Sequence, residues 1–261
     1  MKAFGTRVRA LLFPPRCASC GILLDWYEAG RVSEALCDRC RKKWDEETLE
    51  TCEICGEIVV NCRCITEELS RAKVAELCKL VYYRAGNSDA VQNRVIFRVK
   101  KRRDQRTVDW LCAQMQKHLD EILAKVGAEN VVLTYAPRAK RAVNESGTDQ
   151  AEALARALSH RTGVPLVKTL RRNAGRVQEQ KLLSAEERIR QAKKNYSVRS
   201  RAAEAVKGKT VVLVDDIVTT GATAGASSRL LRRTGALEVH CLVVATDDTN
   251  RDAAVNPTSK K

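Results

Sequence analysis

The decisive stretch of this sequence is Thr210-Val211-Val212-Leu213-Val214-Asp215-Asp216-Ile217-Val218-Thr219-Thr220-Gly221-Ala222-Thr223. Its first five residues are all β-branched or leucine, which is typical of a parallel strand covered on both faces. Two adjacent carboxylates end this run, a Thr-Thr-Gly-x-Thr turn follows, and residues 224–233 have a helix-compatible composition. The stretch therefore predicts a central strand, a loop and the start of a helix.

The predicted loop has the residues of a phosphate-binding turn. Small residues let the backbone approach an anion closely, and inward N–H groups and the helix N-terminus favour negative charge. Asp215 and Asp216, just before the loop, could accept hydrogen bonds from ribose hydroxyls or face a hydrated Mg²⁺. The alternative is an ordinary strand, turn and helix with solvated acids, but the ordered combination is uncommon. The predicted phosphate-binding residues are Thr219, Thr220, Gly221, Ala222 and Thr223.

Length and charge narrow the function classes. The chain has 261 residues, enough for one domain of about 150–200 residues and a smaller module. Its formal net charge of +15 and sequence pI near 9.5 favour a phosphate-rich partner, either a nucleotide-like substrate or nucleic acid. The alternative is a generally basic surface without a specific partner.

The sequence contains no apolar stretch of membrane-spanning length, and residues 1–15 lack the pattern of a secretory signal. We therefore expect a cytoplasmic location. In that compartment clustered cysteines are expected to be metal ligands before disulfides.

Eight of the eleven cysteines form four closely spaced pairs near the N-terminus. A two-residue spacer lets both thiolates of a pair face one tetrahedral Zn²⁺, so eight ligands predict two structural zinc sites without an open position for chemistry. Sequential and interleaved pairing are both possible, and the tighter spacing of the fourth pair predicts a weaker second site. Cys78, Cys112 and Cys241 lie in apolar surroundings and are expected in the core. The predicted ligands are Cys17, Cys20, Cys37, Cys40, Cys52, Cys55, Cys62 and Cys64.

The remaining chain alternates predicted strands and helices. We expect a loop over residues 171–183 that could close over a site, and a disordered polar tail from residue 247. The cations Arg138, Lys140 and Arg141 follow the strand predicted at 131–136, where they could hold pyrophosphate or form an exposed basic turn. Further strands are predicted at 77–83, 166–170, 196–198 and 239–245, and helices at 92–101, 108–126, 148–162 and from Ser184.

The strand with its Asp-Asp pair and Thr-Thr-Gly-x-Thr turn resembles the phosphoribosyl pyrophosphate (PRPP) signature of type I phosphoribosyltransferases. With the cysteine-rich head, almost the whole chain resembles the ComF/GntX family. The resemblance implies an α/β fold with an open, mostly parallel sheet flanked by helices, preceded by a small zinc-ribbon module. It implies a double zinc ribbon over residues 1–70, a phosphoribosyltransferase-like domain over 71–247 and a tail over 248–261.

The resemblance also implies function. Family members are linked to DNA uptake in natural competence, and the signature implies binding of PRPP or a related ribose phosphate with Mg²⁺. One hypothesis is transfer of the phosphoribosyl group to an amine or base with release of pyrophosphate. The other is a binding protein with little transferase activity that holds single-stranded DNA on its basic surface, although aromatic residues, which stack on bases, make up only 4% of the chain.

Individual positions match or depart from the family pattern. Pro137 and Arg141 match the segment after the second strand. The family's Arg-Gly-Phe-Asn-Gln box is replaced by Ser146-Gly147-Thr148-Asp149-Gln150, which keeps Gly147 and Gln150, removes a cation and a stacking group, and adds a negative charge.

Some purine salvage enzymes place an Asp base at the position of Thr219, which cannot act as a base at neutral pH. The nucleophile must then arrive already basic, as an amine or ammonia does, or be deprotonated elsewhere. In the loop region the matches are Gln180, Leu183 and Arg188, with Gln191 where the family often has Asn.

Overall fold

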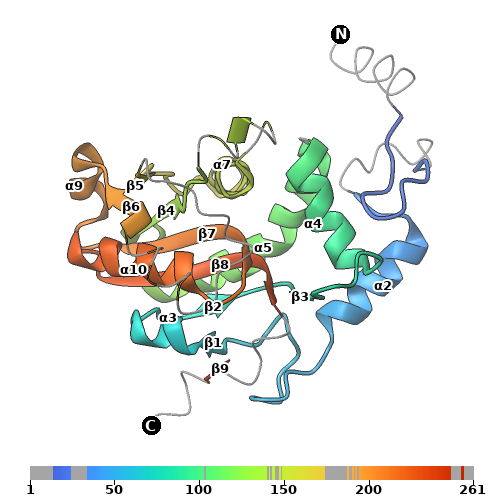
Figure 1. Cartoon of the computed structure of the whole chain (residues 1–261), viewed down its shortest axis with the longest axis horizontal. Coiled ribbons are helices and arrows are strands. Elements are labelled where there is room, and N and C mark those ends of the chain that lie inside the picture. The colour runs from blue at the N-terminus through green and yellow to red at the C-terminus, as the bar shows by residue number, and fades with distance from the viewer. Residues whose placement is uncertain are drawn as a thin grey trace.

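The computed structural model describes residues 14–24, 34–102, 104–139, 141, 143–144, 147, 149–173, 187, 190, 192, 194–247 and 254–255. At its centre lies a five-stranded sheet (Figure 1) with the order β2-β8-β7-β4, in which β3 also pairs with β8. Every strand pair in this sheet is parallel. The strands are β2 (Leu77–Cys78), β3 (Val81–Tyr83), β4 (Val131–Tyr135), β7 (Thr210–Val218) and β8 (Glu238–Asp247).

Strand β7 lies between β4 and β8, so the prediction of a central strand is confirmed. Its residues alternate between two cores, as the two-residue period of a strand requires. Val212 and Val214 belong to one hydrophobic core, and Val211 and Leu213 belong to the other. All four side chains are buried, which explains why the run is apolar without interruption.

Helices cover both faces of the sheet. Residues of α4, α5 and α7 share the core of Val212, whereas residues of α3 and α10 share the core of Val211. The predicted α/β architecture, an open and mostly parallel sheet flanked by helices, is therefore confirmed. The helices are α2 (Asp38–Thr48), α3 (Glu67–Arg71), α4 (Val91–Arg102), α5 (Gln105–Val126), α7 (Gln150–Thr162), α9 (Ala203–Val206) and α10 (Ala222–Arg233), with 3-10 turns η1 (Ala128–Asn130) and η3 (Ser200–Ala202).

Two predicted strands differ from the structure. The strand expected at 77–83 is split into β2 and β3, although both keep one register along β8 and the Leu80 N–H still donates to the Val244 carbonyl at 3.1 Å. In the strand expected at 166–170, Leu166 forms only an isolated bridge with Leu133. The strand begins at Leu170, because its partner is the antiparallel segment 196–198 and not the central sheet.

Two antiparallel pairs lie outside the central sheet: β5 (Leu170–Arg172) with β6 (Tyr196–Val198), and β1 (Ile65–Thr66) with β9 (Ala254–Val255). The second pair differs from the expectation of a disordered tail, because Ala254–Val255 find backbone partners next to the last paired cysteine. The prediction of a loop over 171–183 is wrong for Arg171 and Arg172, which belong to β5, and residues 174–183 lie outside the described residues.

The N-terminal segment packs directly on the α/β part of the chain. Trp44 of α2 is fully buried and meets Trp110 of α5 edge to face, with the ring centroids 4.9 Å apart. Its Nε1 donates a hydrogen bond of 2.8 Å to Oε1 of Gln114. Cys17 and Cys40 belong to the same core as α5. Among the described helices, none is both long and apolar enough to cross a lipid bilayer.

Candidate functional site

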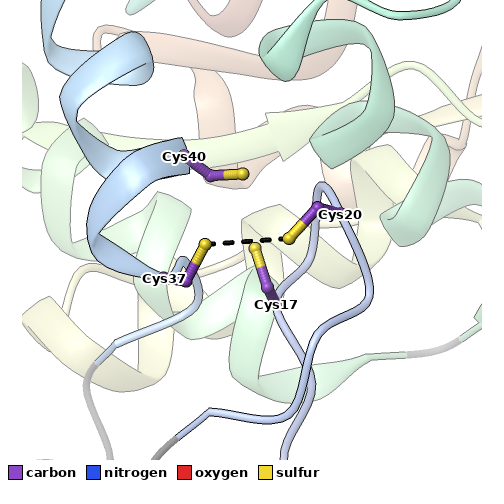
Figure 2. Close-up of side chains that lie close together, drawn as sticks. All are labelled: Cys17, Cys20, Cys37 and Cys40. Atoms are coloured by element: carbon purple, nitrogen blue, oxygen red, sulfur yellow. Dashed lines mark hydrogen bonds between the residues drawn. The ribbon is translucent and has the colours of Figure 1, made fainter.

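The eight paired cysteines form two groups of four. Within each four-cysteine group the sulfur atoms lie within 4.8 Å of one another. In the first group one loop supplies Cys17 and Cys20, the start of α2 supplies Cys37 and Cys40, and the four sulfur atoms point toward a common centre (Figure 2). The second group is made of Cys52, Cys55, Cys62 and Cys64. The structure therefore groups the cysteines sequentially and not in the interleaved arrangement.

The two groups are built on the same backbone turn. The Cys17 and Cys52 carbonyls accept the N–H groups of Gly21 and Gly56 at 3.0 and 2.9 Å, and both glycines have positive φ, +77° and +73°. Each turn thus brings two sulfurs to the same side, as a zinc knuckle requires.

The residues present fit Zn²⁺. Zn–S bonds of about 2.3 Å in a tetrahedron place the sulfurs about 3.8 Å apart, and the Sγ atoms of Cys20 and Cys37 are 3.7 Å apart. All eleven cysteines lie in the described part of the chain, and each is free of disulfides. Burial raises the pKa of Cys40 to about 12 and also raises that of Cys64, so ionisation of these thiols needs a cation nearby. Both groups could hold a zinc ion.

A separate cavity of about 390 Å³ opens where β7 ends and α10 begins. The predicted residues Asp215 and Asp216 line it together with the whole predicted phosphate loop, residues 219–223. Arg138 also lines it, whereas Arg141 is exposed and is not among the lining residues, and Lys140 lies outside the described residues. The structure thus brings the two acids, the loop and one of the three predicted cations to a single cavity.

The loop is shaped by Gly221, which precedes the first residue of α10. Gly221 has φ +79°, a left-handed conformation that glycine adopts without a steric penalty. Its carbonyl accepts the N–H of Gly225 at 2.7 Å, and the Thr220 hydroxyl accepts the N–H of Ala222 at 3.4 Å. The Thr-Thr-Gly-x-Thr sequence therefore forms a tight turn into the helix N-terminus, which favours an anion.

The two acids lie at the mouth of this turn. Asp215 Oδ1 accepts the N–H of Asp216 at 2.9 Å, and Asp216 Oδ1 accepts the N–H of Ile217 at 2.8 Å. Burial and the adjacent Asp216 carboxylate raise the pKa of Asp215. A cation in the cavity would relieve this repulsion, and carboxylate oxygens are the ligands that Mg²⁺ prefers. The pair therefore fits a hydrated Mg²⁺ or the hydroxyls of a ribose.

Arg138 is held by Asp149 and Gln150. Its Nη1 donates to Oε1 of Gln150 at 2.6 Å, and its backbone N–H donates to Oδ2 of Asp149 at 2.9 Å. The other oxygen of Asp149 accepts the N–H of Glu152 at 3.3 Å and caps α7. Asp149 thus accepts two backbone N–H groups with two oxygens, which one amide oxygen does less well. Ser146 and Thr148 lie outside the described residues.

Two residues of the cavity wall are not among the predicted site residues. Arg172 and Tyr196 both line it, one from each strand of the β5–β6 pair. The Arg172 guanidinium lies 5.6 Å from the Tyr196 ring centroid, and its Nη1 donates to the Tyr196 hydroxyl at 3.3 Å. Short strands carry little periodicity, so no signal in the sequence placed these residues at the site. The family matches Gln180, Leu183, Arg188 and Gln191 lie outside the described residues.

One comparison with known proteins, a family-model match, agrees with this architecture. Residues 141–258 match the family model described as phosphoribosyl transferase domain. A solved structure described as the allosteric regulatory enzyme of purine biosynthesis is similar at 30% identity, with a TM-score of 0.30, over 49% of this chain and 25% of that chain. The chain thus spans about a quarter of the length of that protein. A search of curated proteins gave no match. The parallel sheet, the helices on both of its faces and the family match over residues 141–258 give the α/β part of this chain a type I phosphoribosyltransferase-like fold. This part follows two four-cysteine groups compatible with zinc ribbons.

Proposed function

We propose that the protein binds PRPP with Mg²⁺ in the cavity at the end of β7. The observation that carries this proposal is the meeting of Asp215, Asp216 and the 219–223 loop around one cavity of about 390 Å³. The match of residues 141–258 to a phosphoribosyl transferase domain supports it. A cavity of this size suits a small anionic ligand, because small-molecule sites commonly enclose about 300–1,000 Å³.

Each part of the cavity has a distinct task in this proposal. The backbone N–H groups and hydroxyls of the loop hold the 5′-phosphate at the N-terminus of α10. Asp215 and Asp216 accept hydrogen bonds from the ribose hydroxyls and face the hydrated metal. Arg138 and Arg172, which also line the cavity, attract the pyrophosphate group. Mg²⁺, when bound, would neutralise charge on the leaving pyrophosphate.

The proposed reaction is transfer of the phosphoribosyl group to an amine or base. The bond between the anomeric carbon and the pyrophosphate oxygen breaks, its electron pair leaves with pyrophosphate, and the nucleophile's nitrogen forms the new bond. Thr219 cannot accept a proton at neutral pH. The acceptor therefore arrives with a free lone pair, as ammonia or a primary amine does, and the proton it loses passes to solvent.

Calorimetric titration of the intact, zinc-loaded protein with PRPP and Mg²⁺ tests binding, and a pyrophosphate-release assay with ammonia and primary amines tests turnover. We expect saturable binding that depends on Mg²⁺. Absence of binding would refute both an enzyme and a PRPP sensor. Binding without pyrophosphate release would leave only the sensor.

A second candidate is the competence-associated role of the ComF family, with single-stranded DNA held on the basic surface. The formal net charge of +15 favours it, whereas the low aromatic content points to phosphate contacts in place of base stacking. Fluorescence anisotropy with a labelled single-stranded oligonucleotide would then show affinity that falls steeply between low and physiological salt. Affinity that does not change with salt, or no binding at all, would refute this candidate.

We assign the four-cysteine groups a structural role, since four thiolates leave no coordination position for water or substrate. Because zinc thiolates persist under reducing conditions, we infer a cytoplasmic location.

The proposed division near residue 70 separates the ligands of both groups from the transferase-like part, although Trp44 packs against Trp110 across that boundary. Deletion of residues 1–70 should therefore expose part of the core and lower stability, which thermal unfolding would measure.

A further inference from the structure

The second four-cysteine group leads straight into a short helix that touches the phosphate loop. Cys64 is followed by β1 and then by α3, so one residue separates the last sulfur ligand from Thr66. The Thr66 hydroxyl donates to the Thr220 carbonyl in the loop at 3.4 Å. Its oxygen also accepts the N–H of Leu69 at 3.4 Å and so caps α3. A residue 154 positions away in sequence thus holds the backbone of the loop.

The phosphate loop packs closely against α3 and its N-cap residue. A Cβ added to Gly221 would lie 2.5 Å from Thr66 Oγ1 and 3.0 Å from Cγ of Leu69, a fully buried side chain. One turn further along α10, a Cβ on Gly225 would lie 3.1 Å from Cγ of Glu68. Glu68, itself buried, forms an ion pair with Arg229 of α10. Displacement of α3 would therefore remove the support behind the loop and the first turns of α10.

The second group is itself fastened to the central sheet by a buried cation. Lys79, between β2 and β3, is 2% exposed. Its Nζ donates to the Cys62 carbonyl at 3.1 Å and lies 3.2 Å from the Cys62 sulfur. A buried ammonium needs an anionic partner, and a zinc ion with four thiolates carries a net charge of −2. Lys79 therefore suits the metal-loaded group and ties it to the sheet.

The first four-cysteine group is continuous with α2 and not with α3. Its last two ligands stand at the start of α2, whose Trp44 packs on α5 and bonds to Gln114. This contact lies on the α5 face of the sheet, whereas Leu69 of α3 belongs to the opposite core together with Val218 and Ala224, which flank the phosphate loop. The two groups are alike in their cysteine turns but differ in what they support, which makes the first an internal control for the second.

We propose that the second four-cysteine group, when it holds its metal ion, fixes the phosphate loop in its binding conformation through Thr66. Thr66 is then a positioning residue that acts on the ligand through Thr220 and Gly221. The inference about ligand affinity rests on the proposed function of the cavity, whereas the inference about loop order does not.

The first test uses a Thr66→Val variant of the full, zinc-loaded chain, with Thr66→Ser as the rescue variant. Thr234→Val is the matched control, because the Thr234 hydroxyl also donates to a carbonyl of α10, that of Leu230, but at the far end of the helix. Removal of one neutral hydrogen bond should speed amide exchange at residues 219–222 and weaken PRPP binding, each by about three- to tenfold. Thr66→Ser and Thr234→Val should behave as the wild type in both measurements.

The second test compares Cys55→Ser with Cys20→Ser, since each removes the second cysteine of its turn and both side chains are partly exposed. Hydrogen exchange should rise at residues 219–225 in Cys55→Ser, whereas in Cys20→Ser the increase should be confined to the region of α2. Unchanged loop exchange in both Thr66→Val and Cys55→Ser would overturn the proposal, even with PRPP bound normally. Failure of the wild type to bind PRPP would instead refute the proposed function, and the exchange measurements would still decide the coupling.

Discussion

Replacement of both cavity acids by their amides separates a ligand role from a structural one. In the Asp215→Asn/Asp216→Asn double variant the side chains keep their shape but lose their charge. Each acid uses Oδ1 to accept the next backbone N–H, at 2.9 and 2.8 Å, and an Asn side chain keeps an oxygen for that bond. The local backbone should therefore stay in place while the contribution of charge to ligand binding is removed.

The expected loss of affinity follows from the bonds that the carboxylates would make. A hydrogen bond to a charged group contributes about 1.5–3 kcal/mol, so loss of two such bonds should weaken PRPP binding on the order of a hundredfold or more. Calorimetry with Mg²⁺ would measure it. An Asp38→Asn/Asp45→Asn variant is the matched control, because it removes two exposed acids from α2 and should leave the affinity unchanged.

The free energy of unfolding of the double variant should not fall with the PRPP affinity, and at neutral pH it should stay the same or rise. The pKa of Asp215 in the folded protein is raised above its ordinary value of 3.8 by burial and the neighbouring acid. The folded state therefore binds more protons than the unfolded state, and stability falls as pH rises through the folded pKa. At pH 7 the double variant should melt at the same temperature as the wild type or higher, and below about pH 3.8 any gain should vanish. Unchanged PRPP affinity with a large drop in melting temperature at pH 7 would show that the two aspartates are structural and do not bind the ligand.

Three further predictions concern stability and metal binding. Gly221→Ala should lower the free energy of unfolding by about 2 kcal/mol or more in urea denaturation, because alanine disfavours a positive φ and its Cβ would meet the capping hydroxyl of α3; a loss below about 0.5 kcal/mol would contradict this. The His240 imidazole and then Lys125 lower the pKa of Glu76 to about 2, so its stabilising contribution is present above pH 4.5 and is lost as pH falls toward 2. Glu76→Gln should therefore melt lower than the wild type at pH 7 but match it near pH 2, and a constant difference across that range would be inconsistent with the ion pair. The Lys79→Met variant should lose zinc from its second four-cysteine group to a chelator faster than the wild type does, whereas release at the wild-type rate would remove the charge-balancing role of the lysine.

Local patterns made much of this structure predictable. The uninterrupted run from Thr210 predicts a doubly covered central strand, because only such a strand needs apolar side chains on both faces. Cysteine turns are equally local, so two groups of four cysteines that could each hold a metal ion follow from spacing alone. Their sequential grouping could not be predicted, since it depends on where the turn at Cys37 packs relative to the one at Cys17.

The parts that sequence could not predict are contacts between distant segments. Thr66 meets Thr220 across 154 positions, and Arg172 reaches Tyr196 only because two three-residue strands pair. The tail strand at Ala254–Val255 likewise depends on the edge offered by β1. Such contacts produce no hydrophobic periodicity in the sequence, because each is made by only one or two residues from each segment.

The most direct test of PRPP binding at the end of β7 is a crystal structure of the zinc-loaded protein with PRPP and Mg²⁺. We expect the 5′-phosphate against the N–H groups of residues 219–223 and the ribose hydroxyls within hydrogen-bond distance of Asp215 and Asp216. Density for PRPP elsewhere on the surface, or a cavity that stays empty at saturating PRPP, would contradict the assignment of this cavity.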